Sequence, residues 1–138
     1  MRVSTRLFGI SAVLLALPSF AHDLTLKVNN IKSSQGDLLV AVYDKAEHYN
    51  ANTNWLAVKK VKMEATKMAL ALADLPAGSY AIKLFQDENG NGQIDINSMG
   101  IPTEPYGFSN NGGSYGPPSF DEAKVVVDKA TEIEIQLR

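Results

Sequence analysis

A stretch in the second half of the chain alternates oxygen-bearing side chains with small or solvent-facing residues, in the pattern D-x-N-x-N-G-x-x-D that begins at residue 87. A hard cation such as Ca²⁺ prefers six to eight oxygen ligands at about 2.3–2.6 Å, and a curled loop that presents every second side chain can supply most of them. The pattern therefore predicts a calcium-binding loop over residues 87–97. Its expected ligands are the side chains of Asp87, Asn89, Asn91 and Asp95 and the main-chain carbonyl of Gln93.

The loop departs from the EF-hand pattern at its twelfth position, where an EF-hand has a bidentate Glu and this chain has Ser98. Residues 79–85 alternate with period two, which indicates a strand before the loop instead of a helix. We expect Glu104 to supply the missing carboxylate, with Asn97 or water as alternatives, and a weak affinity of about 10⁻⁴ to 10⁻³ M. A turn without metal is the other interpretation, because Asn-Gly and repeated Asp and Asn residues also favour tight turns.

Two histidines suggest a second metal chemistry. If an N-terminal leader is removed after Ala21, His22 becomes the first residue, and its amine and imidazole could chelate Cu²⁺ together, with His48 as a third nitrogen ligand. A solvated N-terminal histidine is the alternative. The two metal hypotheses are separable, because oxygen ligands prefer hard cations whereas imidazole and amine nitrogens prefer Cu²⁺.

Catalytic groups are sparse in the predicted mature chain. A serine nucleophile needs an adjacent base, and His22 and His48 are the histidines that could serve. The sequence has no G-x-S-x-G motif and no cysteine, which excludes a nucleophile elbow, a thiol nucleophile and a disulfide framework. Asp87 and Asp95 are better explained as cation ligands than as an acid and base pair. We therefore expect a protein that is not an enzyme.

The first 21 residues have the layout of a signal peptide. Arg2 and Arg6 precede an apolar run over residues 7–17, and small residues precede a cleavage point after Ala21. This layout predicts a periplasmic or secreted protein with one domain over residues 22–138. The apolar run is too short to span a bilayer comfortably, and no second long apolar run follows, so we do not expect an integral membrane protein.

Charge excludes one class of partner. Removal of the leader takes away two of the thirteen basic residues, which leaves eleven basic against fifteen acidic residues and changes the formal charge from −2 to −4. The chain also lacks a cluster of Lys and Arg, which is the footprint that nucleic-acid binding requires. We therefore expect no nucleic-acid partner.

Seven runs in the mature chain read as strands, separated by turn-forming residues at the spacing typical of a sandwich. The fold prediction is all-β, a single-domain antiparallel two-sheet sandwich, with at most one short helix over residues 44–54 and Trp55 covering a sheet edge or the end of the core. The first two runs are expected to form a hairpin, the second run to be central, and the lysine-rich third run to be an edge. The seven expected strands are residues 23–31, 38–43, 58–65, 67–73, 79–85, 123–127 and 131–137.

Residues 97–120 are rich in Gly and Pro and have almost no periodicity, so they predict a long loop. Its aromatic residues favour an ordered loop, because disordered segments are poor in them. We expect a surface that contacts an envelope protein, a peptide or a glycan, although packing at the open end of the sandwich is the alternative for the two phenylalanines. The candidate contact residues are Tyr106, Phe108, Tyr115 and Phe120.

Four sequence blocks occur together and in order along the mature chain. They are LPAGSYAI at 75–82, the loop at 87–97, EPYGFSN at 104–110 and GPPSF at 116–120. With these blocks the chain resembles a bacterial family of exported proteins catalogued as domain of unknown function 2141. The resemblance implies an exported or periplasmic protein with a sandwich of the transthyretin-like or carboxypeptidase-regulatory-like type, and it assigns no activity.

Overall fold

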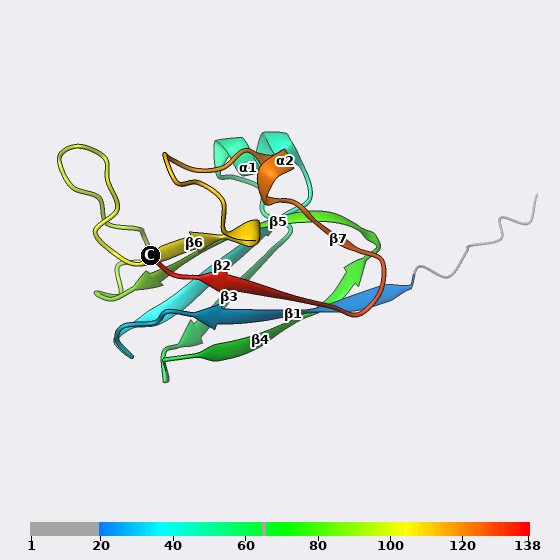
Figure 1. The fold of residues 1–138 in the computed structure, drawn as a ribbon, viewed down its shortest axis with the longest axis horizontal. Helices are drawn as coiled ribbons and strands as arrows, with labels where there is room; N and C mark the ends of the chain where they lie inside the picture. Colours follow the sequence, from blue (N-terminus) through cyan, green and yellow to red (C-terminus); the bar gives the residue numbers. More distant parts are fainter. Residues whose placement is uncertain (1–19, 65) are drawn as a thin grey trace, which may run out of the picture.

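Two β-sheets pack face to face over one hydrophobic core, and two short helices cover the outer face of the larger sheet (Figure 1). The computed structural model describes residues 20–64 and 66–138. Most of the predicted signal peptide, residues 1–21, lies outside these ranges. The predicted two-sheet sandwich is confirmed.

The smaller sheet has three strands in the order β4-β1-β8. Strand β1 (Ala21–Asn29) pairs with β4 (Met68–Pro76) in the antiparallel sense and with β8 (Thr131–Gln136) in the parallel sense. The parallel pair is the exception to the antiparallel arrangement that we predicted. Alternate residues of β1 are buried, so that the period of two in the sequence corresponds to one face on the core.

The larger sheet has five strands, with β2 (Asp37–Tyr43) between β3 (Ala57–Lys62) and β5 (Gly78–Asp87). Two three-residue strands, β6 (Tyr106–Phe108) and β7 (Val125–Val127), pair with different parts of the other side of β5. The predictions of a central second strand and a lysine-rich edge strand are confirmed. Strand β6 was not predicted, because three residues are too few to show a period of two.

The connections between strands differ from the prediction. The expected hairpin of the first two strands is wrong, because β1 and β2 belong to different sheets and the chain over residues 30–36 crosses between them. Strands β4 and β5 also lie in different sheets, joined through Ala77. Half of the Trp55 surface is exposed, so it does not close the end of the core, while its expected place over a sheet edge stays a prediction. Alternation in a strand reports which side chains are buried but not which strand is its neighbour.

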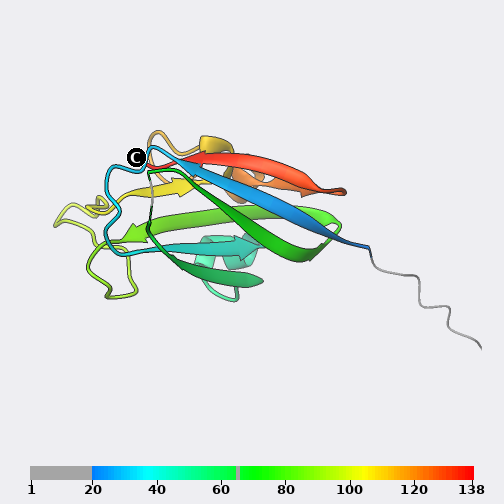
Figure 2. The same ribbon diagram turned by 90° about the horizontal axis from the view of Figure 1, so that it is seen from below.

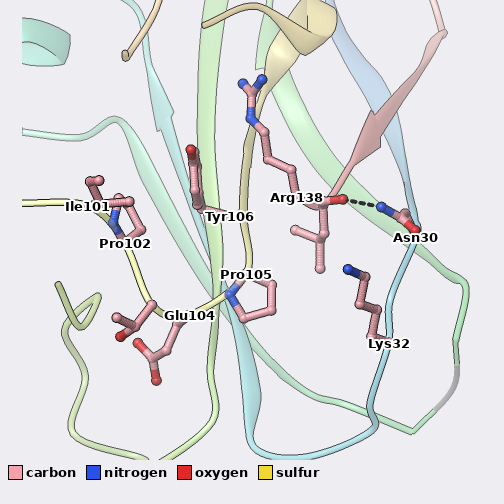
Figure 3. A pocket seen from close by; sticks show the side chains of 10 residues that line it. Asn30, Lys32, Ile101, Pro102, Glu104, Pro105, Tyr106 and Arg138 are labelled. Atoms are coloured by element: carbon pink, nitrogen blue, oxygen red, sulfur yellow. Dashed lines mark hydrogen bonds between the residues drawn. The ribbon is translucent and has the colours of Figure 1, made fainter. Parts of the chain in front are cut away.

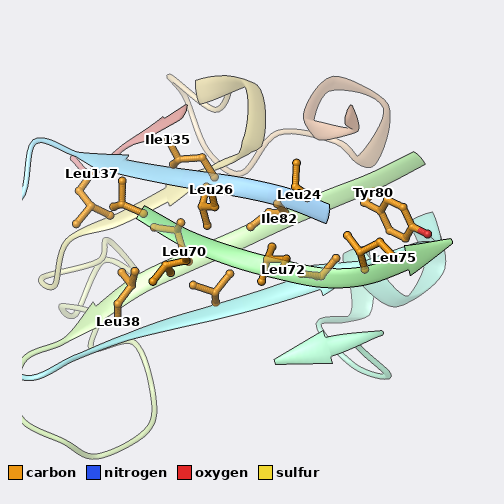
Figure 4. Close-up of a cluster of buried hydrophobic side chains, with 14 of the residues drawn as sticks. Leu24, Leu26, Leu38, Leu70, Leu72, Leu75, Tyr80, Ile82, Ile135 and Leu137 are labelled. Atoms are coloured by element: carbon orange, nitrogen blue, oxygen red, sulfur yellow. The ribbon is translucent and has the colours of Figure 1, made fainter. Parts of the chain in front are cut away.

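The core lies between the two sheets and is made of aliphatic side chains from both (Figure 4). Leu24 and Leu26 of β1 face Ile82 of β5, and all three are fully buried. A buried side chain of this kind contributes about 1.5–3 kcal/mol relative to the exposed state. These contacts hold both sheets, and therefore the loops at their ends, in a fixed relation.

The helices form a second, smaller layer on the outer face of the larger sheet. In α1 (Ala46–Ala51), Tyr49 packs against Tyr43, while in α2 (Phe120–Ala123) Ala123 joins the same cluster. Beneath α1, the Lys83 ammonium donates a 2.7 Å hydrogen bond to the Tyr49 carbonyl, and burial lowers the pKa of Lys83. Within the described ranges, no helix has the length and apolar character needed to cross a bilayer.

Candidate functional site

The loop between β5 and β6 projects from the same end of the sandwich as the connection between β1 and β2 (Figures 1 and 2). Gln86, which is fully buried near the end of β5, donates hydrogen bonds to the carbonyls of Ser33 (3.1 Å) and Gln35 (2.7 Å). Gly36 approaches so closely that an added Cβ would lie 2.0 Å from the Asp87 carbonyl oxygen. The two connections are therefore packed together, which fixes the start of the candidate loop.

Asp87 is the last residue of β5 and is fully buried. Its Oδ1 accepts hydrogen bonds from the backbone N–H groups of Gly90 (2.9 Å) and Asn91 (3.2 Å), and its Oδ2 accepts one from Gly92 (2.8 Å). The backbone therefore curls around this carboxylate. Hydrogen bonds to an ionised acceptor are stronger than neutral ones, so Asp87 organises the first half of the loop.

Glu104 returns to the loop from a position two residues before β6, and only 6% of its surface is exposed. Its Oε1 accepts the N–H of Glu88 and its Oε2 accepts the N–H of Asp95, each at 2.9 Å. One carboxylate therefore connects both ends of the curled segment. The expectation that Glu104 lies beside the loop agrees with this geometry, while its role as a metal ligand stays a prediction.

Asp95 faces the two asparagines that were expected to act with it. The side-chain amide of Asn91 donates to Asp95 Oδ1 at 2.8 Å, and that of Asn89 donates to Asp95 Oδ2. The amide oxygen of Asn91 accepts the N–H of Gln93 at 3.0 Å. The structure thus brings three of the predicted ligand side chains together, those of Asn89, Asn91 and Asp95, but hydrogen bonds connect them, and the Asp87 and Glu104 carboxylates contact backbone N–H groups instead.

The acidic side chains of the loop form no ion pair with the described residues. The described residues 20–64 and 66–138 form four ion pairs, and none of these reaches Asp87, Glu88, Asp95 or Glu104. In the same ranges, no three carboxylate or imidazole side chains lie close enough to hold an ion by themselves. A cation at this loop would therefore need the amide and carbonyl oxygens of the sequence pattern as well as its carboxylates.

The distal part of the loop, residues 95–103, forms a small hairpin of its own. Backbone hydrogen bonds join Thr103 N to Asp95 O (2.8 Å) and Asn97 N to Ile101 O (2.9 Å). At the turn, Asn97 Oδ1 accepts the N–H groups of Met99 (2.9 Å) and Ile101 (3.0 Å). These contacts present three exposed aliphatic side chains, which we call the aliphatic tip: Ile96, Met99 and Ile101, with exposed fractions of 59%, 76% and 51%.

Our sequence reasoning missed the aliphatic tip. The available signal was an apolar residue at positions 94, 96, 99 and 101 within an otherwise polar loop. Apolar residues are more often buried than exposed, so the sequence alone did not show that the side chains at these four positions reach the solvent.

A cleft of about 410 Å³ lies at the base of the tip (Figure 3). Ile101, Pro102 and Tyr106 line it together with two basic residues, Lys32 from the β1–β2 connection and Arg138. The backbone of Tyr106 exchanges hydrogen bonds with that of Arg138 (3.2 and 3.0 Å), which joins the two sheets behind the cleft. Glu104 also lines the cleft, although both of its carboxylate oxygens accept backbone N–H groups.

The four aromatic candidates have different surroundings. Phe108 is buried, and Phe120 is half-buried with its ring centroid 5.9 Å from that of Tyr49. Both phenylalanines therefore pack against the body of the protein, but Phe120 does so on the outer face of the larger sheet and not at the open end of the sandwich that the alternative named. Tyr106 is half-buried and lines the cleft, whereas Tyr115 is fully exposed. These tyrosines are the members of the set that can contact a partner.

The two histidines of the copper hypothesis lie in different layers. His22 is in β1 of the smaller sheet, where it pairs with Leu75. His48 is in α1, which packs on the outer face of the larger sheet. The structure does not bring His48 to His22. Copper binding by the amine and imidazole of an N-terminal His22, without His48 as a third ligand, stays a prediction.

Comparison with known proteins places the chain in a family. Residues 26–135 match the model of the family described as "Uncharacterized protein conserved in bacteria (DUF2141)". The chain belongs to this family. No curated protein and no solved structure matches it. Membership in DUF2141 agrees with the resemblance of the four sequence blocks, and the chemistry of the chain has to be argued from its own geometry.

Proposed function

We propose that this DUF2141 protein is a non-enzymatic binding protein of the bacterial cell envelope, exported through its N-terminal segment. In this proposal the loop over residues 87–104 binds Ca²⁺, and the ion stabilises a surface that contacts a partner. The observation that carries the proposal is the pair of buried carboxylates, Asp87 and Glu104, which meet the same loop as Asp95 and form no ion pair with any described residue.

Burial of charge supports a cation at this loop. A buried ionised group is unfavourable unless it is paired or well hydrogen-bonded. Here backbone N–H groups supply the hydrogen bonds, and within residues 20–64 and 66–138 no Lys or Arg forms an ion pair with these carboxylates, although Lys32 and Arg138 line the same cleft as Glu104. Both oxygens of Glu104 and both oxygens of Asp87 accept backbone N–H groups. A divalent ion would balance the charge that remains.

Oxygen donors for such an ion are available at the predicted positions. Each amide of Asn89 and Asn91 presents nitrogen to Asp95, and a half-turn of the amide would present its oxygen instead. Ca²⁺ between these groups would then replace the two amide hydrogen bonds to Asp95, and the turned amides would also give up the N–H groups of Asn91 and Gln93 that their oxygens now accept. The exchange of existing contacts for metal contacts is consistent with a weak site of about 10⁻⁴ to 10⁻³ M.

Thermal unfolding tests the proposal. The protein is unfolded in excess EDTA and in about 10 mM Ca²⁺, beside Asp95→Asn and a matched control, Asp121→Asn, whose exposed carboxylate pairs with Lys124. At 10 to 100 times the dissociation constant, binding to the folded state stabilises it by about 1.4–2.7 kcal/mol. We expect this Ca²⁺-dependent stabilisation in the parent and in Asp121→Asn, and a loss of most of it in Asp95→Asn.

Two outcomes would contradict the proposal. An equal midpoint for the parent in EDTA and in Ca²⁺ would make the loop a turn without metal. A Ca²⁺ effect of the same size in Asp95→Asn would place the ion elsewhere. Mg²⁺ at the same concentration serves as the ionic control, since Mg²⁺ demands near-octahedral geometry and loses its bound water reluctantly.

A further inference from the structure

Asn-Gly dipeptides occur twice in the curled loop, at residues 89–90 and 91–92, and a third lies at residues 111–112. An asparagine before a glycine is the pair most open to deamidation, because glycine has no side chain to hinder the backbone nitrogen that attacks the amide. Gly90 and Gly92 are exposed to solvent, and a Cβ added at either would meet nothing within 4 Å. Local sequence and access of water therefore both favour this modification in the loop.

The chemistry of deamidation requires only water. The glycine nitrogen loses its proton and bonds to the side-chain carbonyl carbon of the asparagine, and the amide nitrogen leaves with that proton as ammonia. Water then opens the resulting succinimide ring at either carbonyl, which gives aspartate or isoaspartate, and neither step oxidises or reduces an atom. The asparagine side chain and the next backbone nitrogen must therefore both be free to approach each other.

Both attacking nitrogens of the loop are held by one carboxylate. The N–H of Gly90 donates to Asp87 Oδ1 at 2.9 Å, and the N–H of Gly92 donates to Asp87 Oδ2 at 2.8 Å. Loss of either proton would place a second negative charge beside the carboxylate, and like charges this close repel strongly. A carboxylate is also far too weak a base to remove an amide proton. Because Asp87 is fully buried, it holds these nitrogens in the unreactive, protonated form.

The asparagine side chains are held as well. Asn89 Oδ1 accepts the N–H of Asn91 at 3.2 Å, and Asn91 Oδ1 accepts the N–H of Gln93 at 3.0 Å, as in the turns that Asn side chains commonly form. The amide nitrogens of both asparagines donate to Asp95. Closure of a succinimide ring would have to break these contacts in addition to those of the glycine nitrogens.

We infer that Asn89 and Asn91 are sites of spontaneous deamidation, and that Asp87 sets the rate by holding the nitrogens of Gly90 and Gly92. Deamidation replaces a neutral amide by a carboxylate, so the modified side chain no longer donates a hydrogen bond to an acidic partner. Isoaspartate also lengthens the backbone by one carbon, which changes the curl of the loop. The inference concerns the loop without metal, goes beyond the proposed Ca²⁺ binding and does not require it.

Mass spectrometry of proteolytic peptides tests the inference. The protein is incubated in EDTA at mildly alkaline pH, and deamidated peptides are counted over time by the mass gained when NH₂ is replaced by OH. We compare the folded parent, the parent in concentrated urea, Asp87→Asn and Glu104→Ala. Asn111 is the internal control in every sample, because its side chain is held by the backbone of Glu134 (3.2 Å) and Gln136 (2.8 Å) in β8 and not by Asp87.

The folded parent should deamidate in the loop about tenfold more slowly than the parent in urea, because each N–H is bonded to a charged acceptor. Asp87→Asn should regain most of the rate in urea, with no change at Asn111. Glu104→Ala loosens the loop but keeps the hydrogen bonds of Asp87, so its acceleration should be smaller.

Four outcomes would overturn the inference. The first two are equal loop rates in the folded parent and in urea, and equal loop rates in the folded parent and in Asp87→Asn. Equal acceleration in Asp87→Asn and Glu104→Ala would assign the protection to the fold of the loop as a whole. Acceleration of the same size at Asn111 would assign the effect of Asp87→Asn to general unfolding. Because EDTA is present, failure of Ca²⁺ binding leaves these outcomes unchanged.

Discussion

Replacement of Glu104 tests whether one carboxylate holds the loop together. Its two oxygens accept the N–H groups of Glu88 and Asp95 at 2.9 Å each, and the side chain is nearly buried. A hydrogen bond to a charged group contributes about 1.5–3 kcal/mol, and partial access of water to the two N–H groups reduces their sum. We therefore expect Glu104→Ala to lower the free energy of unfolding by about 2–4 kcal/mol in EDTA.

The variant Glu104→Gln separates charge from shape. Its amide oxygen can still accept one N–H group, but its NH₂ group faces the other N–H group, donor against donor. We expect a smaller loss of about 1–3 kcal/mol. The matched control is Glu134→Gln on an exposed side chain, which should change stability little.

Urea unfolding measures the free energies, and amide hydrogen exchange by NMR locates the effect. In both Glu104 variants the amides of Glu88 and Asp95 should exchange faster, while the amide of Leu26 in the core should respond only through global stability. Parent-like exchange at both loop amides, together with parent-like stability of Glu104→Ala, would refute the assignment of Glu104 as the connection across the loop.

Three further perturbations address the scaffold of the site. Gly36→Ala should lower stability by about 3 kcal/mol or more, because its Cβ would lie 2.0 Å from the Asp87 carbonyl oxygen in a backbone with φ +75°. Its control, Gly100→Ala, has φ +77° and no neighbour within 4 Å, so it should lose only about 1–2 kcal/mol for the left-handed backbone. Urea midpoints measure both losses, and equal losses would contradict the close approach at Gly36. Burial raises the pKa of Tyr49 to about 12 from 10.0, so the folded state keeps a proton that the unfolded chain loses, and stability should fall by about 1–2 kcal/mol between pH 10 and 12. Unfolding at both pH values should show a smaller fall in Tyr49→Phe, and an unchanged fall would be evidence against this titration. Leu26→Ala, at a fully buried side chain, should lower the free energy of unfolding in urea by about 2–5 kcal/mol. Its control, Val126→Ala, is at an exposed side chain and should lose under about 1 kcal/mol. A Leu26→Ala effect as small as that of Val126→Ala would show that this part of the core is not closely packed.

Local patterns in the sequence were enough for several features. The alternation through Leu24, Leu26 and Val28 predicted a strand with one buried face, and the apolar run of 38–43 predicted a central strand. The spacing of Asp87, the asparagines and the glycines predicted a curled loop, because an Asp side chain can reach the N–H groups three to five residues later without help from the rest of the fold.

Other features depend on contacts between residues far apart in the chain. The crossing of the chain between β1 and β2 depends on which sheet each strand joins, and both strands have apolar faces that either sheet could bury. The exposure of Ile96 and Met99 depends on a hairpin that projects beyond the sheets, since an apolar side chain is buried only where another element covers it.

By itself, then, the sequence determined the β-rich class, the central and edge strands and the curl of the loop, because each of these depends on residues within one segment. Tertiary structure decided that Glu104 returns across the loop, that Phe108 packs inward, and that Lys32 meets the base of the aliphatic tip. These arrangements arise when two sheets pack on a shared core and carry separate connections to the same end of the sandwich, which no local spacing encodes.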